Sequence, residues 1–129
     1  MQTRDQKYAA IIYDRVSRIE NQVGYKQYGA MAHKLPILIR TAGLVQALEF
    51  VNARGKGLQK QLLEDLAVTV EQNDTANLLR SVRSANLSEY MRLTQHIMAA
   101  LLWYKRFAQS ILKVDASEAA LLPEEEKND

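Results

Sequence analysis

Basic side chains at a regular spacing are the first chemical signal in this sequence. In residues 3–22 they recur at steps of three and four, which on a helix places them along one face. The face is almost purely basic, with Asp5 and Asp14 beside it. Arg15 and Arg18 lie one turn apart, so their head groups can reach neighbouring phosphates of a nucleic-acid strand. A face that serves only solubility is the alternative. The residues of this basic face are Arg4, Lys7, Ile11, Arg15, Arg18 and Gln22.

A second basic cluster lies among aromatic residues, in the run Trp103-Tyr104-Lys105-Arg106-Phe107. On a helix these five side chains point in different directions, so some pack inward while others face solvent. Lys105 and Arg106 are the basic residues of this run. Aromatic rings beside them can stack on bases or pack against a neighbouring helix, and we assign Trp103 and Phe107 to packing.

Residues that could catalyse a reaction are hard to find. There are no cysteines, which removes disulfides, thiolate zinc sites and cysteine nucleophiles. The two histidines, His33 and His96, have no carboxylate at the spacing of a metal site, and we assign both to the surface or to packing. Glu64 and Asp65 are adjacent, so on a helix they point about 100° apart and cannot chelate one ion. We predict a protein that is not an enzyme and has no cofactor or metal.

The elements that must position these residues are helices. Glycine and proline are scarce, at five and two residues, and strand-like alternation is nearly absent. Gly24 is expected to stop the first helix in a left-handed conformation, and Asn86 with Glu89 resembles a capping box. Pro36 either ends a helix or kinks it. The segments with apolar residues at helical spacing are 3–22, 25–34, 37–50, 58–72, 75–83 and 87–114.

The prediction is therefore an all-α fold, a compact single-domain helical bundle of about six helices with a kink near Pro36. The apolar stripe of 87–114 covers more than half of the helix circumference, which is typical of a central helix packed on several sides.

Charge divides the chain into two parts. The 129 residues have a net charge of +2, but residues 1–114 hold 16 bases and nine acids, and residues 115–129 hold one base and six acids. We predict a helical domain over 1–114 with charge +7 and an acidic tail over 115–129 with charge −5. A basic body indicates a polyanionic partner. No segment approaches the roughly 20 apolar residues that span a membrane, and no export signal is found, so we expect a cytoplasmic protein without a membrane partner.

Two stretches have a more specific pattern. In His33-Lys-Leu-Pro-Ile-Leu-Ile-Arg-Thr-Ala-Gly-Leu-Val-Gln-Ala-Leu-Glu-Phe50, Leu-Pro is followed by Ile-Arg-Thr, then by Gly-Leu and by Gln-Ala-Leu-x-Phe. Tyr90 and the run from Trp103 to Ala108 form the second match. On these motifs, residues 3–114 resemble the small α-helical subunit of the type III-B CRISPR RNA-guided effector complex, the Cmr complex. That family usually has an aliphatic residue where this chain has Tyr104.

The resemblance implies a non-catalytic structural subunit. Members of the family stack as an inner filament beside the larger subunits that hold the guide RNA, and they help to hold the target RNA in a positively charged channel. Binding of this kind depends on backbone charge and duplex shape rather than on base sequence. The implied partners are other subunits of the complex, copies of this chain, and the backbones of guide RNA and target RNA. No small-molecule substrate is implied.

Six basic residues are the candidates for phosphate contacts. Three of them carry over from positions within the matched motifs, namely Arg40, Lys105 and Arg106. The other three follow from the geometry of helical faces alone, namely Arg15, Arg18 and Lys34. Pro36 and Gly43 are expected to be structural, setting a bend and a close approach between helices.

Two other classes of protein remain open. A helix-turn-helix DNA-binding module needs a short exposed recognition helix, for which the segment 75–83 with Arg80 and Arg83 is the candidate. A helical adaptor that binds only protein would leave RNA binding unchanged when the basic residues are reversed to glutamate. For the acidic tail, we expect either a solvated segment or one that covers the basic face of the free subunit until RNA displaces it. In the second case, deleting 115–129 raises the RNA affinity of the free subunit.

Overall fold

The computed structural model describes residues 1–117. This part of the chain contains six helices and no strand. The all-α prediction is confirmed. Residues 118–129 of the predicted acidic tail lie outside the described residues, so both expectations for the tail stay predictions. The helices are α1 (Arg4–Ile19), α2 (Tyr25–Ala42), α3 (Leu44–Arg54), α4 (Leu58–Thr69), α5 (Thr75–Ser84) and α6 (Leu87–Ser110).

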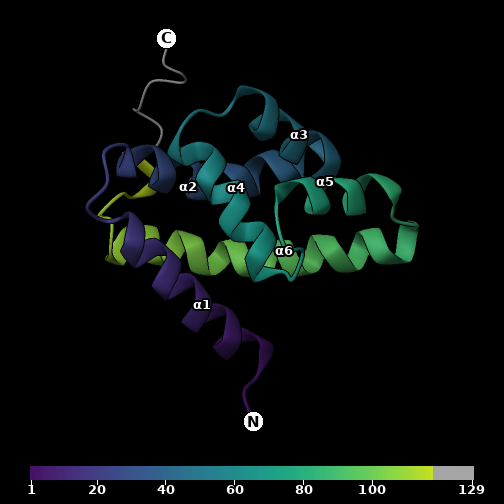
Figure 1. Cartoon of the computed structure of the whole chain (residues 1–129), viewed down its shortest axis with the longest axis horizontal. Coiled ribbons are helices and arrows are strands. Elements are labelled where there is room, and N and C mark those ends of the chain that lie inside the picture. Colours follow the sequence, from purple (N-terminus) through teal and green to yellow (C-terminus); the bar gives the residue numbers. More distant parts are fainter. Residues whose placement is uncertain (118–129) are drawn as a thin grey trace.

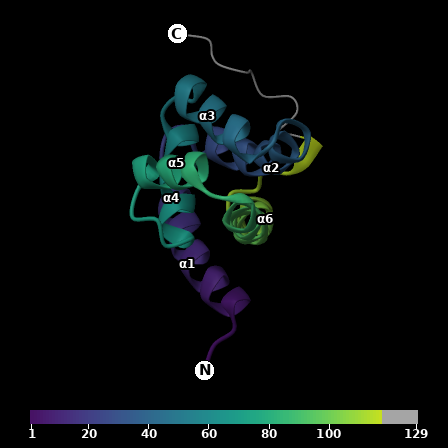
Figure 2. The ribbon, with the colours of Figure 1, turned by 90° about the vertical axis from the view of Figure 1, so that its right-hand side faces the viewer.

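The longest helix, α6, organises the bundle. It runs along one side of the molecule, and α1 crosses it with its N-terminal end projecting away from the body (Figure 1). The helices α1, α2 and α4 all pack against α6, and Figure 2, which looks along α6, shows α2 above it and α4 beside it. The prediction that this helix packs on several sides is therefore confirmed, although it lies at the edge of the bundle and not at its centre (Figure 1). Its buried residues are Leu93, Ile97, Ala100, Leu101, Tyr104 and Ala108.

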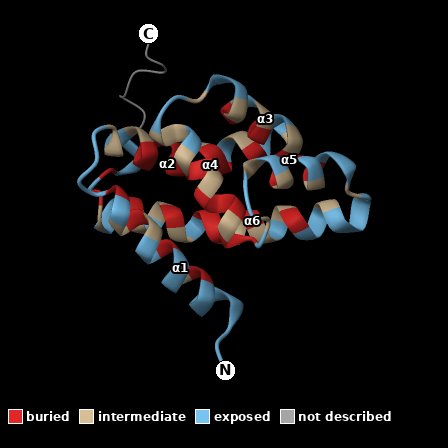
Figure 3. Cartoon of the chain, viewed as in Figure 1, coloured by how far each residue is buried: buried red, intermediate tan, exposed pale blue. Residues whose placement is uncertain are grey.

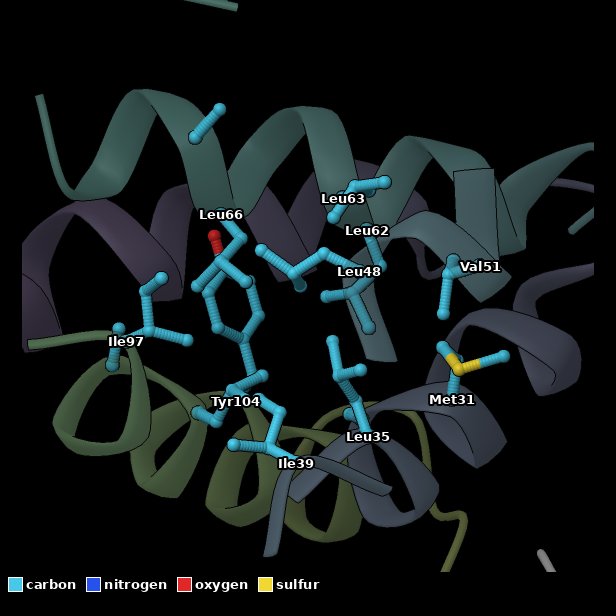
Figure 4. Close-up of a cluster of buried hydrophobic side chains, with 14 of the residues drawn as sticks. Met31, Leu35, Ile39, Leu48, Val51, Leu62, Leu63, Leu66, Ile97 and Tyr104 are labelled. Carbon is cyan, nitrogen blue, oxygen red and sulfur yellow. The ribbon is translucent and has the colours of Figure 1, made fainter. Parts of the chain in front are cut away.

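The core lies between α6 and the helices α2, α3 and α4. Leu35, Leu48, Leu66 and Ile97 each have no exposed surface and meet there around the ring of Tyr104 (Figure 4). Burying such an aliphatic side chain contributes about 1.5–3 kcal/mol. Buried residues gather where the helices meet, whereas the N-terminal end of α1 is largely exposed (Figure 3). The core therefore fixes α6 and leaves one end of α1 free to present polar side chains.

The helix that contains Pro36 continues past it. The alternative that a helix ends at Pro36 is wrong, because α2 continues to Ala42 and the boundary with α3 falls at Gly43. Gly43 has φ 92°, a conformation that residues with a side chain rarely adopt. Pro36 has no N–H to donate to the carbonyl of Ala32, a loss that costs about 3 kcal/mol or more in a helix. Burial of Leu35 and Pro36 in the core offsets that loss.

Two helix ends also differ from the predictions. The first helix ends at Ile19, and Gly24, with φ 92°, precedes α2 instead of closing α1. The last helix ends at Ser110, before Lys113, whose φ of 62° cannot continue a right-handed helix. In both places a left-handed residue marks a change of chain direction.

After α6 the chain folds back onto α2. Val114 is fully buried, and its carbonyl accepts a hydrogen bond from Nε2 of His33 at 2.8 Å. A Cβ placed on Gly29 would lie 3.0 Å from the side chain of Val114, so a glycine allows this close approach. His33 is thus a packing residue, as predicted.

Candidate nucleic-acid interface

Arg15 points into the protein rather than toward a partner. Its Nη1 lies 3.2 Å from Oδ1 of Asp65 on α4, a residue only 2% exposed. The same carboxylate accepts hydrogen bonds from Tyr28 Oη at 2.6 Å and from Gln61 Nε2 at 2.8 Å. Burial, together with the neighbouring Tyr104 and Asp65, raises the pKa of Tyr28 well above 10.0, so it stays a donor. The charge of Arg15 therefore balances a buried carboxylate.

Arg18 lies on the surface but also has an acidic partner. Its Nη2 donates to Oδ2 of Asp14 at 2.7 Å, and the two side chains are 64% and 62% exposed. Asp14 thus reaches onto the face that the sequence predicts to be basic. Exposed pairs of this kind contribute only about 0–1 kcal/mol. A phosphate can therefore compete with Asp14 for Arg18 at little cost.

The two candidates on α2 differ in their surroundings. Arg40 is exposed in the last turn of the helix. Lys34 is partly buried and lines a pocket of about 250 Å³ between α2, α3 and the start of α4. The pocket is largely apolar and includes Ile37 and Phe50, which are 54% and 45% exposed. Of this pair, Arg40 is better placed to meet a phosphate.

On α6 the aromatic residues beside the basic pair do pack. The ring centroids of Trp103 and Phe107 are 5.7 Å apart, and Phe107 meets Tyr13 of α1 edge-on at 5.5 Å. The guanidinium of Arg106 lies 4.8 Å from the centre of the Trp103 ring. Arg106 is exposed and Lys105 is partly buried. The two basic residues thus border an aromatic cluster that joins α6 to α1.

Cationic residues from two helices that are far apart in the sequence line a groove between α1 and α6. We call it the α1/α6 groove; its volume is about 390 Å³. Arg4 and Lys7 line it from α1, Arg92 and His96 line it from α6, and Glu71 lies at the turn after α4. The remaining lining residues are Tyr8, Ile11, Val68, Thr69, Val70, Gln72 and Leu93.

The electrostatics of the groove are visible at His96. Burial lowers the pKa of this imidazole below its ordinary 6.5, and the positive charges of Arg4 and Arg92 lower it further, whereas Glu71 opposes them. The helical spacing of Arg92 and His96, four residues apart, is present in the sequence. That these two residues face Arg4 and Lys7 follows only from how α1 crosses α6.

Within residues 1–117, no group of three or more His, Cys, Asp or Glu side chains could hold a metal ion. No helix in this part of the chain is long and apolar enough to cross a membrane.

Comparison with known proteins identifies the family of this chain. Residues 4–111 match the family described as CRISPR-associated protein (Cas_Cmr5). The chain belongs to the Cas_Cmr5 family. It is 43% identical over 113 residues to the CRISPR system Cmr subunit Cmr5 of Thermus thermophilus, a match that covers 88% of this chain and 99% of the relative. The crystal structure of a CRISPR-associated Cmr5 family protein from Thermus thermophilus superposes with a TM-score of 0.84 at 44% identity, covering 87% of this chain and 99% of that one.

The motifs that indicated the Cas_Cmr5 family act in this structure as fold contacts. Gly43 leaves the start of α3 without a capping side chain of its own. The hydroxyl of Tyr90 supplies the cap, because it accepts hydrogen bonds from the backbone N–H groups of Leu44 at 3.0 Å and Val45 at 3.3 Å. The Gly-Leu motif and Tyr90 are therefore parts of one contact between α3 and α6.

Tyr104, where the Cas_Cmr5 pattern as read from the sequence has an aliphatic residue, is fully buried. Its hydroxyl lies 2.9 Å from Oγ1 of Thr69, which in turn donates to the carbonyl of Asp65. Burial raises the pKa of Tyr104 far above 10.0. The added hydroxyl is thus accommodated by a partner on α4.

Proposed function

We propose that this chain is the small structural subunit of a type III-B CRISPR (Cmr) effector complex. Copies of it would stack as an inner filament and hold the guide–target RNA duplex through its backbone, without catalysing a reaction. The observation that carries this proposal is membership of the Cas_Cmr5 family over residues 4–111, with a 43% identical relative that is itself a Cmr subunit. Its partners would be other Cmr subunits, further copies of the chain and RNA, in the cytoplasm.

The charge of the helical body supports an RNA partner. Residues 1–114 carry +7, and three of the six candidate residues, Arg18, Arg40 and Arg106, are exposed. Contacts between such side chains and phosphates release counterions, so they weaken steeply as salt rises. A filament of many copies would add these contacts along one strand, whereas a single free subunit would bind RNA weakly.

A charge-reversal experiment in the assembled complex tests this function. The variant Arg18→Glu/Arg40→Glu/Lys105→Glu/Arg106→Glu should weaken target-RNA retention in a filter assay at moderate salt, with subunit stoichiometry unchanged. Each lost phosphate contact should also reduce the slope of log affinity against log salt by about 0.7–0.9. Arg15 is left out, because its reversal would place a second negative charge beside buried Asp65.

The control variant reverses the two arginines of α5. Arg83 pairs with Glu49 at 2.6 Å, and Arg80 hydrogen-bonds Asn77 on the same helix. Arg80→Glu/Arg83→Glu should leave target-RNA retention unchanged. If target-RNA retention is unchanged in the first variant, the protein-only adaptor is favoured. DNA binding is measured separately, and loss of sequence-selective DNA binding in Arg80→Glu/Arg83→Glu favours the helix-turn-helix alternative.

A further inference from the structure

We propose that the α1/α6 groove binds a phosphodiester of an RNA backbone between two opposed rows of cationic side chains. The identity of the RNA rests on the proposed function, whereas the anion chemistry rests on the groove itself. None of the six candidate phosphate contacts lines this groove, although Arg4, Lys7 and Ile11 of the predicted basic face do.

The two rows come from different helices and face each other. Arg4 and Lys7 are one turn apart on α1, and Arg92 and His96 are one turn apart on α6. Side chains at these spacings lie on the same face of a helix. The floor between the rows is lined by buried residues, since Tyr8, Val70 and Leu93 are 7%, 7% and 5% exposed. An anion in the groove would therefore be held by its walls.

The charge of the groove is not balanced within the described chain. Arg15, Arg18 and Arg83 each have a carboxylate partner. Across residues 1–117, by contrast, no ion pair joins Arg4, Lys7 or Arg92 to an acid, and Glu71 is the one acid that lines the groove. Three permanent cations against one carboxylate leave a net positive site, which favours a phosphate that accepts from several donors at once.

A single phosphodiester group fits this site better than a base or an acidic side chain does. The groove is about 390 Å³ and is lined by α1, α6 and the end of α4 with its turn, so one phosphate of a strand can lie between the rows. Arginine donates from a planar fork that suits two phosphate oxygens at once. Placing one arginine on each wall lets the two guanidinium groups contact opposite sides of the same phosphate.

Binding should be linked to a proton on His96. In the free protein partial burial lowers the pKa of the imidazole, and the positive charges of Arg4 and Arg92 lower it further. A phosphate between the rows adds a negative charge that favours the imidazolium, so His96 takes up a proton as the anion binds. Affinity should therefore rise as pH falls from about 7.5 toward 6, through the range in which a histidine titrates. The charged and titratable groups that face His96 are Arg4, Lys7 and Tyr8 on α1, Glu71 on the turn after α4, and Arg92 on α6.

The first experiment uses the free full-length protein and inorganic sulfate, whose charge is constant between pH 5 and 8. The pKa of His96 is followed through its ring-proton NMR shifts, with His33 as internal reference because it is buried against Val114. We expect sulfate to raise the pKa of His96 and to leave the ring-proton shifts of His33 in place. A His96 pKa that sulfate does not move, or that moves equally in Arg4→Gln/Arg92→Gln, would overturn the proposal.

The second experiment measures binding of a single-stranded RNA oligonucleotide to the same proteins, each checked for native helicity. Arg4→Gln/Arg92→Gln should lose affinity more than the equally charged control Lys60→Gln/Arg80→Gln, whose residues lie along α4 and α5. Glu71→Gln should gain affinity, because it removes the acid that opposes the phosphate. Equal losses in both double variants, or no gain in Glu71→Gln, would overturn the groove as the RNA site. Both of these outcomes leave the proposed function open, because that function is tested by RNA retention in the assembled complex.

Discussion

Replacing Arg15 by glutamine tests the conclusion that this residue serves the core rather than RNA. The change leaves the carboxylate of Asp65, which is 2% exposed, with only Tyr28 and Gln61 as side-chain donors among the described residues. Removing one member of a buried ion pair costs about 3–5 kcal/mol, mostly because the other charge stays buried. The side chain of Arg15 is 27% exposed, and two donors remain. We therefore expect a loss of about 2–3 kcal/mol in the free energy of unfolding.

Urea unfolding followed by circular dichroism measures this loss. The midpoint should fall with an unchanged slope, and the thermal midpoint should fall by about 8–12 °C for a folded part of this size. Arg18→Gln is the matched control, because it removes an exposed pair worth about 0–1 kcal/mol.

The pair Arg15–Asp65 can also be isolated from the rest of the network. In a double-mutant cycle with Asp65→Asn, the coupling energy between the two sites should exceed about 0.5 kcal/mol, the usual limit for independent sites. An Arg15→Gln protein no less stable than Arg18→Gln would refute the reasoning, and Arg15 would return to the list of candidate phosphate contacts.

Two further substitutions test the contacts of the motif residues. Tyr90→Phe removes the cap of α3, so we expect a loss of about 1 kcal/mol and faster hydrogen exchange at the amides of Leu44 and Val45; unchanged exchange would contradict the capping role. Thr69→Val strands the buried hydroxyl of Tyr104, whereas Tyr104→Phe leaves Thr69 with its backbone acceptor. Thr69→Val should therefore cost more, about 2 against about 1 kcal/mol in urea unfolding, and the reverse order would argue against this hydrogen bond.

Local features of the fold could be predicted from the sequence because they depend on neighbouring residues. The capping box at Asn86 is an example, since the Asn86 side chain accepts from the N–H of Glu89 at 2.9 Å. The wide apolar stripe of α6 is another, because its periodicity requires burial on several sides. Pro36 shows the limit of such local rules. The cost of a proline inside a helix is local, but the burial that offsets it comes from side chains on other helices.

The candidate site could be predicted less well, because its chemistry depends on contacts between distant residues. Arg15 and Arg18 follow the same helical face, yet the acid that binds Arg15 is 50 residues away in the sequence. No spacing rule on α1 can identify Asp65 as a partner. In the same way, the pattern on α6 places Arg92 beside His96, but only the crossing of α1 and α6 brings Arg4 opposite them.

The distinction between fold contacts and binding contacts bears on how the family motifs should be used. Gly43 and Tyr90 meet at the start of α3, and His33 binds the carbonyl of Val114 across 81 residues. Trp103 belongs to the aromatic cluster that joins α6 to α1. Each of these contacts holds the bundle together, so a sequence that keeps the fold will keep the motif whether or not it binds RNA. Substitutions in the motifs therefore test folding first. Cations that lack an acidic partner within residues 1–117, such as Arg4 and Arg92 in the α1/α6 groove, are where a loss of RNA affinity can be separated from a loss of stability.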